Sequence, residues 1–136
     1  MIDIVISDTR DIKLEDVLAL YTANKWSAAE KPVELYNGLM NSHALFSAWD
    51  KEKLVGIGNS ISDGYLVVYY PHMLVHPNYQ GKGIGRMIMK KMQEKYGDFH
   101  MQMLTADGKA IEFYNKVGFV KAGNTEPMWI YQGDEH

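Results

Sequence analysis

Residues 75–86 read VHPNYQGKGIGR and join two different kinds of structure. The stretch before them alternates as a strand, and the stretch after them repeats with a helical period. Three glycines occupy alternate positions, 81, 83 and 85, in this join. The first N–H groups of a helix lack partners within the helix and lie at the positive end of its dipole, and glycines carry no Cβ that would keep a phosphate away. The stretch therefore predicts a phosphate-binding turn.

Two common nucleotide-binding patterns do not fit this turn. A Walker loop requires Ser or Thr after its Gly-Lys pair, whereas Gly81 and Lys82 are followed by Gly83. A Rossmann fingerprint requires its third glycine three residues after the second, and Arg86 stands there. The spacing excludes both patterns.

The composition restricts the class of protein. The chain has 136 residues, 46% of them hydrophobic, which predicts a single domain over residues 1–136 with a proper core. Basic and acidic residues are spread along the chain with a net charge of −3, so we expect no nucleic-acid or anionic-lipid partner. The absence of cysteine excludes disulfides and a cysteine-bound acyl intermediate. No leader or apolar run of about 18 residues is visible, which favours a cytoplasmic protein without a membrane segment.

The first third of the chain predicts one strand and two helices. Ile2, Ile4 and Ile6 alternate as a strand. A helix with Leu14, Val17, Leu18 and Tyr21 on one face should follow, with Asp11 as its N-cap and Asn24 at its end. Pro32 is suited to the first position of a second helix that reaches Met40.

The remainder predicts an α+β domain. Residues 43–75 indicate three antiparallel strands, with Asp63-Gly64 as a two-residue hairpin turn and residues 65–75 as the third strand. A helix with Ile84, Met87, Ile88, Lys91 and Met92 in one stripe should end at Gly97. A strand over 99–104, a helix over 109–117 and a final strand pair at 119–120 and 128–131 complete a mixed sheet of about six to seven strands with four helices.

Two segments together resemble the GNAT superfamily of N-acetyltransferases. Gln80, Gly83 and Gly85 match the superfamily pattern Gln/Arg-x-x-Gly-x-Gly/Ala, and residues 110–119, AIEFYNKVGF, resemble its later helix. The resemblance implies the GNAT fold, in which strands four and five, here the expected strands over residues 65–75 and 99–104, are splayed apart at the cofactor site. It further implies transfer of acetyl from acetyl-CoA, as cosubstrate, to a primary amine by direct attack in a ternary complex.

The resemblance also assigns roles to residues. It implies that CoA binds at the strand before the turn and at the turn itself, through Met73, Leu74, Val75, Gln80, Gly81, Lys82, Gly83, Ile84, Gly85 and Arg86. Backbone donors near Leu74 would polarise the thioester carbonyl. Tyr114 occupies the position of the acid that protonates the departing thiolate and would also contact the cofactor.

The base that takes the proton of the amine has three candidates. His72 is the side chain on the expected strand over residues 65–75 that is suited to act as a base. Asp63, or water ordered by Tyr69 and Tyr70, are the other options. His72 and His76 would lie about 13 Å apart along a strand, so we expect no metal site.

Aromatic residues supply candidates for the acceptor site, which we predict to be walled by Trp26, Tyr36, Tyr65 and Tyr69. Two positions depart from the family pattern. Asp107 stands where Asn is usual, and Pro71 cannot donate within a ladder, which predicts an edge or a bulge at that point.

The sequence leaves several questions open. A non-catalytic acyl-CoA-binding sensor and an interaction domain without CoA affinity are the alternative functions. The identity of the amine is undetermined, and the resemblance makes a homodimer possible.

Overall fold

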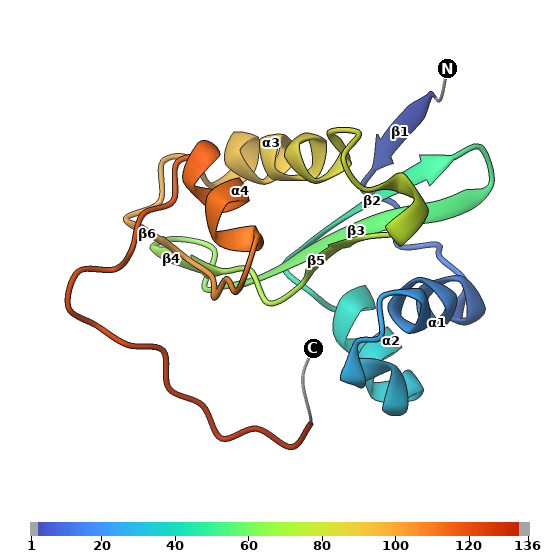
Figure 1. The fold of residues 1–136 in the computed structure, drawn as a ribbon, viewed down its shortest axis with the longest axis horizontal. Helices are drawn as coiled ribbons and strands as arrows, with labels where there is room; N and C mark the ends of the chain where they lie inside the picture. Colours follow the sequence, from blue (N-terminus) through green and yellow to red (C-terminus); the bar gives the residue numbers. More distant parts are fainter. Residues whose placement is uncertain (1–2, 134–136) are drawn as a thin grey trace.

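The computed structural model describes residues 3–133, which form a twisted six-stranded sheet between two layers of helices. Figure 1 shows α3 and α4 over one face and α1 and α2 over the other. The strands are β1 (Ile4–Ser7), β2 (Ala44–Asp50), β3 (Lys53–Ser62), β4 (Val67–Tyr69), β5 (Met73–Val75) and β6 (Met101–Met103). The helices are α1 (Leu14–Ala23), α2 (Pro32–Met40), α3 (Ile84–Tyr96) and α4 (Ala110–Lys116), with 3-10 turns η1 (Ser27–Glu30) and η2 (Pro77–Tyr79). The expected mixed α+β architecture is confirmed.

The sheet is antiparallel except at one edge. Its order is β1-β2-β3-β4-β6, with β5 paired separately to β3, and β4 runs parallel to β6. The ten-residue strand β3 carries both short strands, because Gly56–Gly58 pairs with β5 while Ile61 and Ser62 pair with β4. The sheet therefore divides at the end of β3, and β4 and β5 lie on separate paths.

The expected third strand over residues 65–75 is interrupted. It consists of β4 and β5, separated by Tyr70, Pro71 and His72. Pro71 has no N–H to give to a ladder, and the strand is broken at this point. At His72 the backbone carbonyl accepts from the backbone N–H of Asn59 at 3.1 Å, but the N–H of His72 donates to the side-chain Oδ1 of Asn59, also at 3.1 Å. A side chain thus replaces the ladder where the two strands separate.

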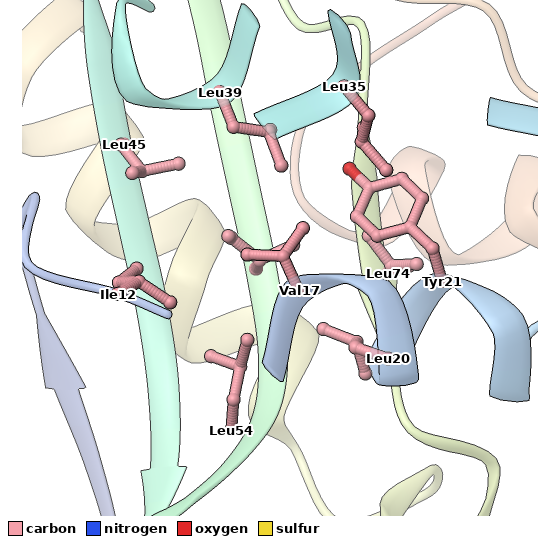
Figure 2. Close-up of a cluster of buried hydrophobic side chains, with 10 residues drawn as sticks. Ile12, Val17, Leu20, Tyr21, Leu35, Leu39, Leu45, Leu54 and Leu74 are labelled. Carbon is pink, nitrogen blue, oxygen red and sulfur yellow. The ribbon is translucent and has the colours of Figure 1, made fainter. Parts of the chain in front are cut away.

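Each face of the sheet has its own core. Under α1 and α2 the buried side chains, most of which are labelled in Figure 2, are Ile12, Val17, Leu20, Tyr21, Leu35, Leu39, Leu45, Leu54, Ile57 and Leu74. On the other face α3 buries Ile84, Ile88, Met89, Met92 and Tyr96. The predicted α3 stripe is therefore partly wrong, since Met87 and Lys91 are exposed while Met89 is buried.

Three local predictions are wrong. The N-cap residue of α1 is Lys13 rather than Asp11, because the helix begins only at Leu14. Residues 63–66, not two residues, connect β3 to β4, because the Asp63 carboxylate accepts three backbone N–H groups and closes a wider turn. Residues 117–133 contain no strand. Ile2, predicted to begin the first strand, lies outside the described residues.

The chain after α4 runs away from the sheet and back toward α2 (Figure 1). Its apolar alternation resembles a strand, but no sheet edge lies beside it, and Met128 and Ile130 are 93% and 96% exposed. Phe119 alone remains in the core, packed edge to face against Tyr70 and Tyr114. A strand requires a hydrogen-bonded neighbour as well as an alternating pattern.

Residues 3–133 contain neither a candidate membrane-spanning helix nor a cluster of metal ligands. None of the helices described combines the length and hydropathy that crossing a bilayer demands. Within the same range, no three His, Asp or Glu side chains gather as metal ligands would.

Candidate functional site

The glycine turn presents open backbone at the start of α3. Gly81 and Gly83 have φ angles of 79° and 84°, in the left-handed region that glycine adopts without strain. A Cβ added at either position would meet nothing within 4 Å. Gly83 is the N-cap residue of α3, no side chain caps the helix, and its first turn has no acidic residue. The first N–H groups of α3 are therefore directed toward space that an anion can enter.

Gly85 is required for close packing, unlike Gly81 and Gly83. A Cβ there would lie 3.2 Å from Cζ of Phe113 and 3.3 Å from Cε of Met73. The missing side chain thus allows α3, α4 and β5 to meet at one point. Ile84 is only 1% exposed, so its side chain belongs to the core and only its backbone can face a ligand.

Strand β5 is paired on one side only. In the ladder between β5 and β3, the backbone N–H of Asn59 donates to the carbonyl of His72, and the backbone N–H of His76 donates to the carbonyl of Val55. Bonded residues alternate in an antiparallel ladder, so Leu74 directs its backbone groups to Ile57.

The open edge of β5 is therefore formed by the residues on either side of Leu74. The backbone groups of Met73 and Val75 face that edge, where the Val75 carbonyl accepts from Nε2 of Gln80 at 3.0 Å. The N–H groups that face outward near Leu74 are those of Met73 and Val75, while Leu74 itself pairs with Ile57.

Tyr114 lies on α4 with its ring packed into the core of the α3 face. It contacts Phe113 and Phe119 edge to face, with ring centroids 5.0 and 5.8 Å apart. Burial raises the pKa of Tyr114 to about 12, so the phenol carries its proton at neutral pH. Neutral Tyr114 can donate a proton and cannot serve as a base.

Two cavities meet at Pro71 and His72. The first, called the α2 cavity, has a volume of about 740 Å³ and is lined among others by Lys31, Glu34, Leu39, Asn59, Pro71 and His72. The second, called the tail cavity, has a volume of about 590 Å³ and is lined among others by Tyr69, Pro71, His72, Asp107, Trp129 and Tyr131. His72 thus lies where a molecule in one cavity would reach the other.

The side chain of His72 is held on several sides. Its Nδ1 lies 2.7 Å from the hydroxyl of Tyr21 on α1. Trp26 packs edge to face on the imidazole at 5.2 Å between centroids, and the Tyr21 ring lies at 5.4 Å. The position of this histidine is set by the helix layer below the sheet.

The four predicted acceptor-wall residues occupy different places. Tyr69 lines the tail cavity. Trp26 does not line either cavity and packs on His72. Tyr36 donates to the backbone carbonyl of Ile12 at 2.6 Å, and Tyr65 is 89% exposed on the turn after β3. Tyr36 and Tyr65 therefore do not wall the cavities.

The carboxylates of Asp63 and Asp107 lie in different surroundings. Asp63 accepts backbone N–H groups from Tyr65, Leu66 and Val67, and these bonds lower its pKa, which makes it a poor base. It lines neither cavity. Asp107 lines the tail cavity and does not cap α4, whose N-cap residue is Lys109.

Sequence reasoning does not identify Tyr21, Trp129 and Tyr131 as residues of this region. Tyr21 lines neither cavity, but its hydroxyl reaches His72, 51 positions away, which lines both. Trp129 and Tyr131 stack in parallel with centroids 4.4 Å apart, and Tyr131 bonds to Ser27 at 2.8 Å, which joins the tail to η1. Their alternate spacing is the one signal that could have placed both on one face of an extended chain.

Comparison with known proteins identifies the family. Residues 41–121 match the sequence model described as an acetyltransferase (GNAT) domain. The chain belongs to the GNAT family. A GNAT-family acetyltransferase from Streptococcus pneumoniae TIGR4 is 30% identical, with a TM-score of 0.78 over 97% of this chain and 99% of that chain. Acetyl transfer from acetyl-CoA is the activity of this family of enzymes.

Two further similarities extend over most of the GNAT chain. An uncharacterized N-acetyltransferase, ycf52, from Porphyra purpurea is 26% identical over 126 residues, which cover 88% of this chain and 71% of that protein. The structure of AAC(6')-Iy with the bisubstrate analogue CoA-S-monomethyl-acetylneamine has a TM-score of 0.71 at 14% identity, covering 97% of this chain and 99% of that chain. The second likeness concerns the fold alone.

Proposed function

We propose that this GNAT protein transfers the acetyl group of acetyl-CoA to a primary amine by direct attack in a ternary complex. The observation that carries the proposal is the open glycine turn at the start of α3, which adjoins the unpaired edge of β5. Positive φ at Gly81 and Gly83, an uncapped helix start and the absence of acidic residues in its first turn are what a pyrophosphate needs. The whole chain lacks cysteine, so a cysteine cannot carry the acetyl group.

Acetyl-CoA would be held by the backbone of residues 81–86 and by the open edge of β5. Lys82 and Arg86 are exposed beside the turn and add positive charge. Acetyl-CoA supplies an acetyl group activated as a thioester. Outward N–H groups of Met73 and Val75 would stabilise negative charge on a carbonyl oxygen placed at this edge.

Tyr114 would act as the acid of the reaction. Burial keeps its phenol protonated, and α4 meets β5 and the start of α3 through Phe113, the residue before it. A proton donated from this hydroxyl would neutralise the departing thiolate. The role requires only the hydroxyl oxygen, since the ring is held by packing against Phe113 and Phe119.

The acceptor amine would enter the tail cavity. Its lining combines the aromatic rings of Tyr69, Trp129 and Tyr131 with the carboxylate of Asp107. Aromatic faces and one carboxylate favour a cationic amine on an apolar body.

Thiol release from acetyl-CoA, measured across a panel of amines, tests this proposal. We expect release that depends on the amine, with the acetyl group recovered on the amine nitrogen by mass spectrometry. Release at the same rate with and without every amine would contradict it, and acetyl-CoA binding without any turnover would favour the sensor function.

A further inference from the structure

Tyr21 is a fully enclosed phenol in contact with His72. It extends from α1 into the core under the sheet, beside Leu20, Leu35 and Leu74 in Figure 2, and it is 0% exposed. Its hydroxyl forms one hydrogen bond within residues 3–133, to Nδ1 of His72 at 2.7 Å. An O–H group buried without an acceptor destabilises the folded protein. The proton of Tyr21 must therefore point at Nδ1.

The protonation state of Tyr21 also makes its hydroxyl the donor in the hydrogen bond to His72. Burial raises the pKa of Tyr21, so the hydroxyl keeps its proton throughout the range in which an imidazole is neutral. A neutral imidazole has one ring nitrogen that accepts and one that donates. Because Nδ1 accepts from Tyr21, the proton of neutral His72 resides on Nε2.

A second tyrosine–histidine pair shows why Tyr21 is informative. The hydroxyl of Tyr96 bonds both to Nδ1 of His43 and to Oγ of Ser60, so its proton has two possible acceptors. Tyr21 has a single partner in the described chain, and its direction is determined.

We infer that Tyr21 is a positioning residue that fixes His72 in the Nε2–H tautomer, so that neither ring nitrogen of neutral His72 can serve as a base. The backbone of His72 is held by Asn59 on both its N–H and its carbonyl, and Trp26 packs against the ring. Reversing the imidazole would break the bond between Nδ1 and Tyr21. The prediction that His72 removes the proton of the amine is replaced by one in which His72 keeps its own proton on Nε2, and the amine proton leaves to water.

The tautomer is tested by ¹⁵N NMR of the histidine side chains in the full chain, with His72 assigned from the spectrum of His72→Gln. We expect a pyridine-type shift at Nδ1 and a pyrrole-type shift at Nε2 in the neutral wild-type protein. In Tyr21→Phe the two shifts should move toward an averaged mixture. Tyr36→Phe, which removes another internal tyrosine hydroxyl bond, should leave both shifts in place.

A protonated Nδ1 in the wild-type protein would overturn the inference, and the wild-type spectrum decides this even if Tyr21→Phe does not fold. An equal response of the His72 shifts to Tyr36→Phe would also overturn it, because the effect would then be general to the core.

The exclusion of His72 as the base is tested by exchanging His72 itself, and this part rests on the proposed function. A Gln amide can place an N–H near the position of Nε2 but cannot accept the proton of an ammonium group. His72→Gln should therefore retain kcat/KM within about tenfold of wild type. A loss of about a hundredfold or more in His72→Gln, with the protein still folded, would indicate a base and contradict the inference. If no amine is acetylated at all, the proposed function fails while the NMR result still stands.

Discussion

Asn59→Ala should destabilise the protein through the point where β4 and β5 separate. Asn59 is 6% exposed on β3, its Oδ1 accepts from the backbone N–H of His72 at 3.1 Å, and its Nδ2 donates to Oγ of Ser42 at 2.9 Å. Alanine would leave the His72 N–H without an acceptor, because the β3 ladder supplies none there. A stranded internal donor costs about 1–3 kcal/mol. We expect the free energy of unfolding to fall by this amount.

Urea denaturation measures the loss, with Asn41→Ala as the matched control. The side-chain amide of Asn41 also donates a hydrogen bond, to the backbone carbonyl of Asn37 at 2.8 Å, but Asn41 lies on the surface at the end of α2. With a slope of about 1–3 kcal/mol/M, the Asn59→Ala midpoint should fall by roughly 1 M at constant slope, whereas the control should change the free energy by less than about 0.5 kcal/mol. Equal effects of the two variants would refute the idea that the Asn59 side chain replaces the ladder.

Three further predictions concern the turns and the acid. Gly83→Ala should lower the free energy of unfolding by about 1–2 kcal/mol, because the φ of Gly83 is 84°. Gly38→Ala should raise the free energy of unfolding by about 0.5–1 kcal/mol, because Gly38 lies inside α2 and a Cβ there would meet nothing within 4 Å. Thermal denaturation that gave both changes the same sign would contradict this prediction. Asp63→Asn should destabilise the protein at neutral pH. Backbone N–H groups depress the folded pKa of Asp63, so its contribution is present above the unfolded pKa of about 4 and is lost as the pH falls further, and the gap between wild type and variant in denaturation curves should close on acidification. Tyr114→Phe should reduce kcat about a hundredfold without changing the Kd of acetyl-CoA, and unchanged turnover would remove Tyr114 from the acid role.

The parts of the fold that follow from neighbouring residues could be predicted from the sequence. Pro32 begins α2 because a proline needs no N–H partner at the first helical position, and α3 ends at Tyr96 before Gly97. The glycine turn was visible because its spacing implies a strand-to-helix join. Gly81 and Gly83 need only their own backbone angles to be understood.

Features that depend on distant contacts could not be predicted. The division of residues 65–75 into β4 and β5 depends on Asn59, which lies 13 positions before His72. The bond between Tyr21 and His72 joins residues on a helix and at a strand end, and periodicity indicates only that Tyr21 is buried. Residues 128–131 alternate as a strand should, yet alternation alone does not supply a neighbouring edge for their backbone.

The most direct test of the account is the shift in the denaturation midpoint caused by acetyl-CoA. A ligand bound only by the native state must stabilise it, by about 2.7 kcal/mol at a concentration one hundred times its Kd. We predict a midpoint that rises with acetyl-CoA concentration in the wild-type protein and rises less in Gly83→Ala. A midpoint that stays constant as acetyl-CoA increases would contradict the assignment of the α3 turn and the β5 edge as the cofactor site.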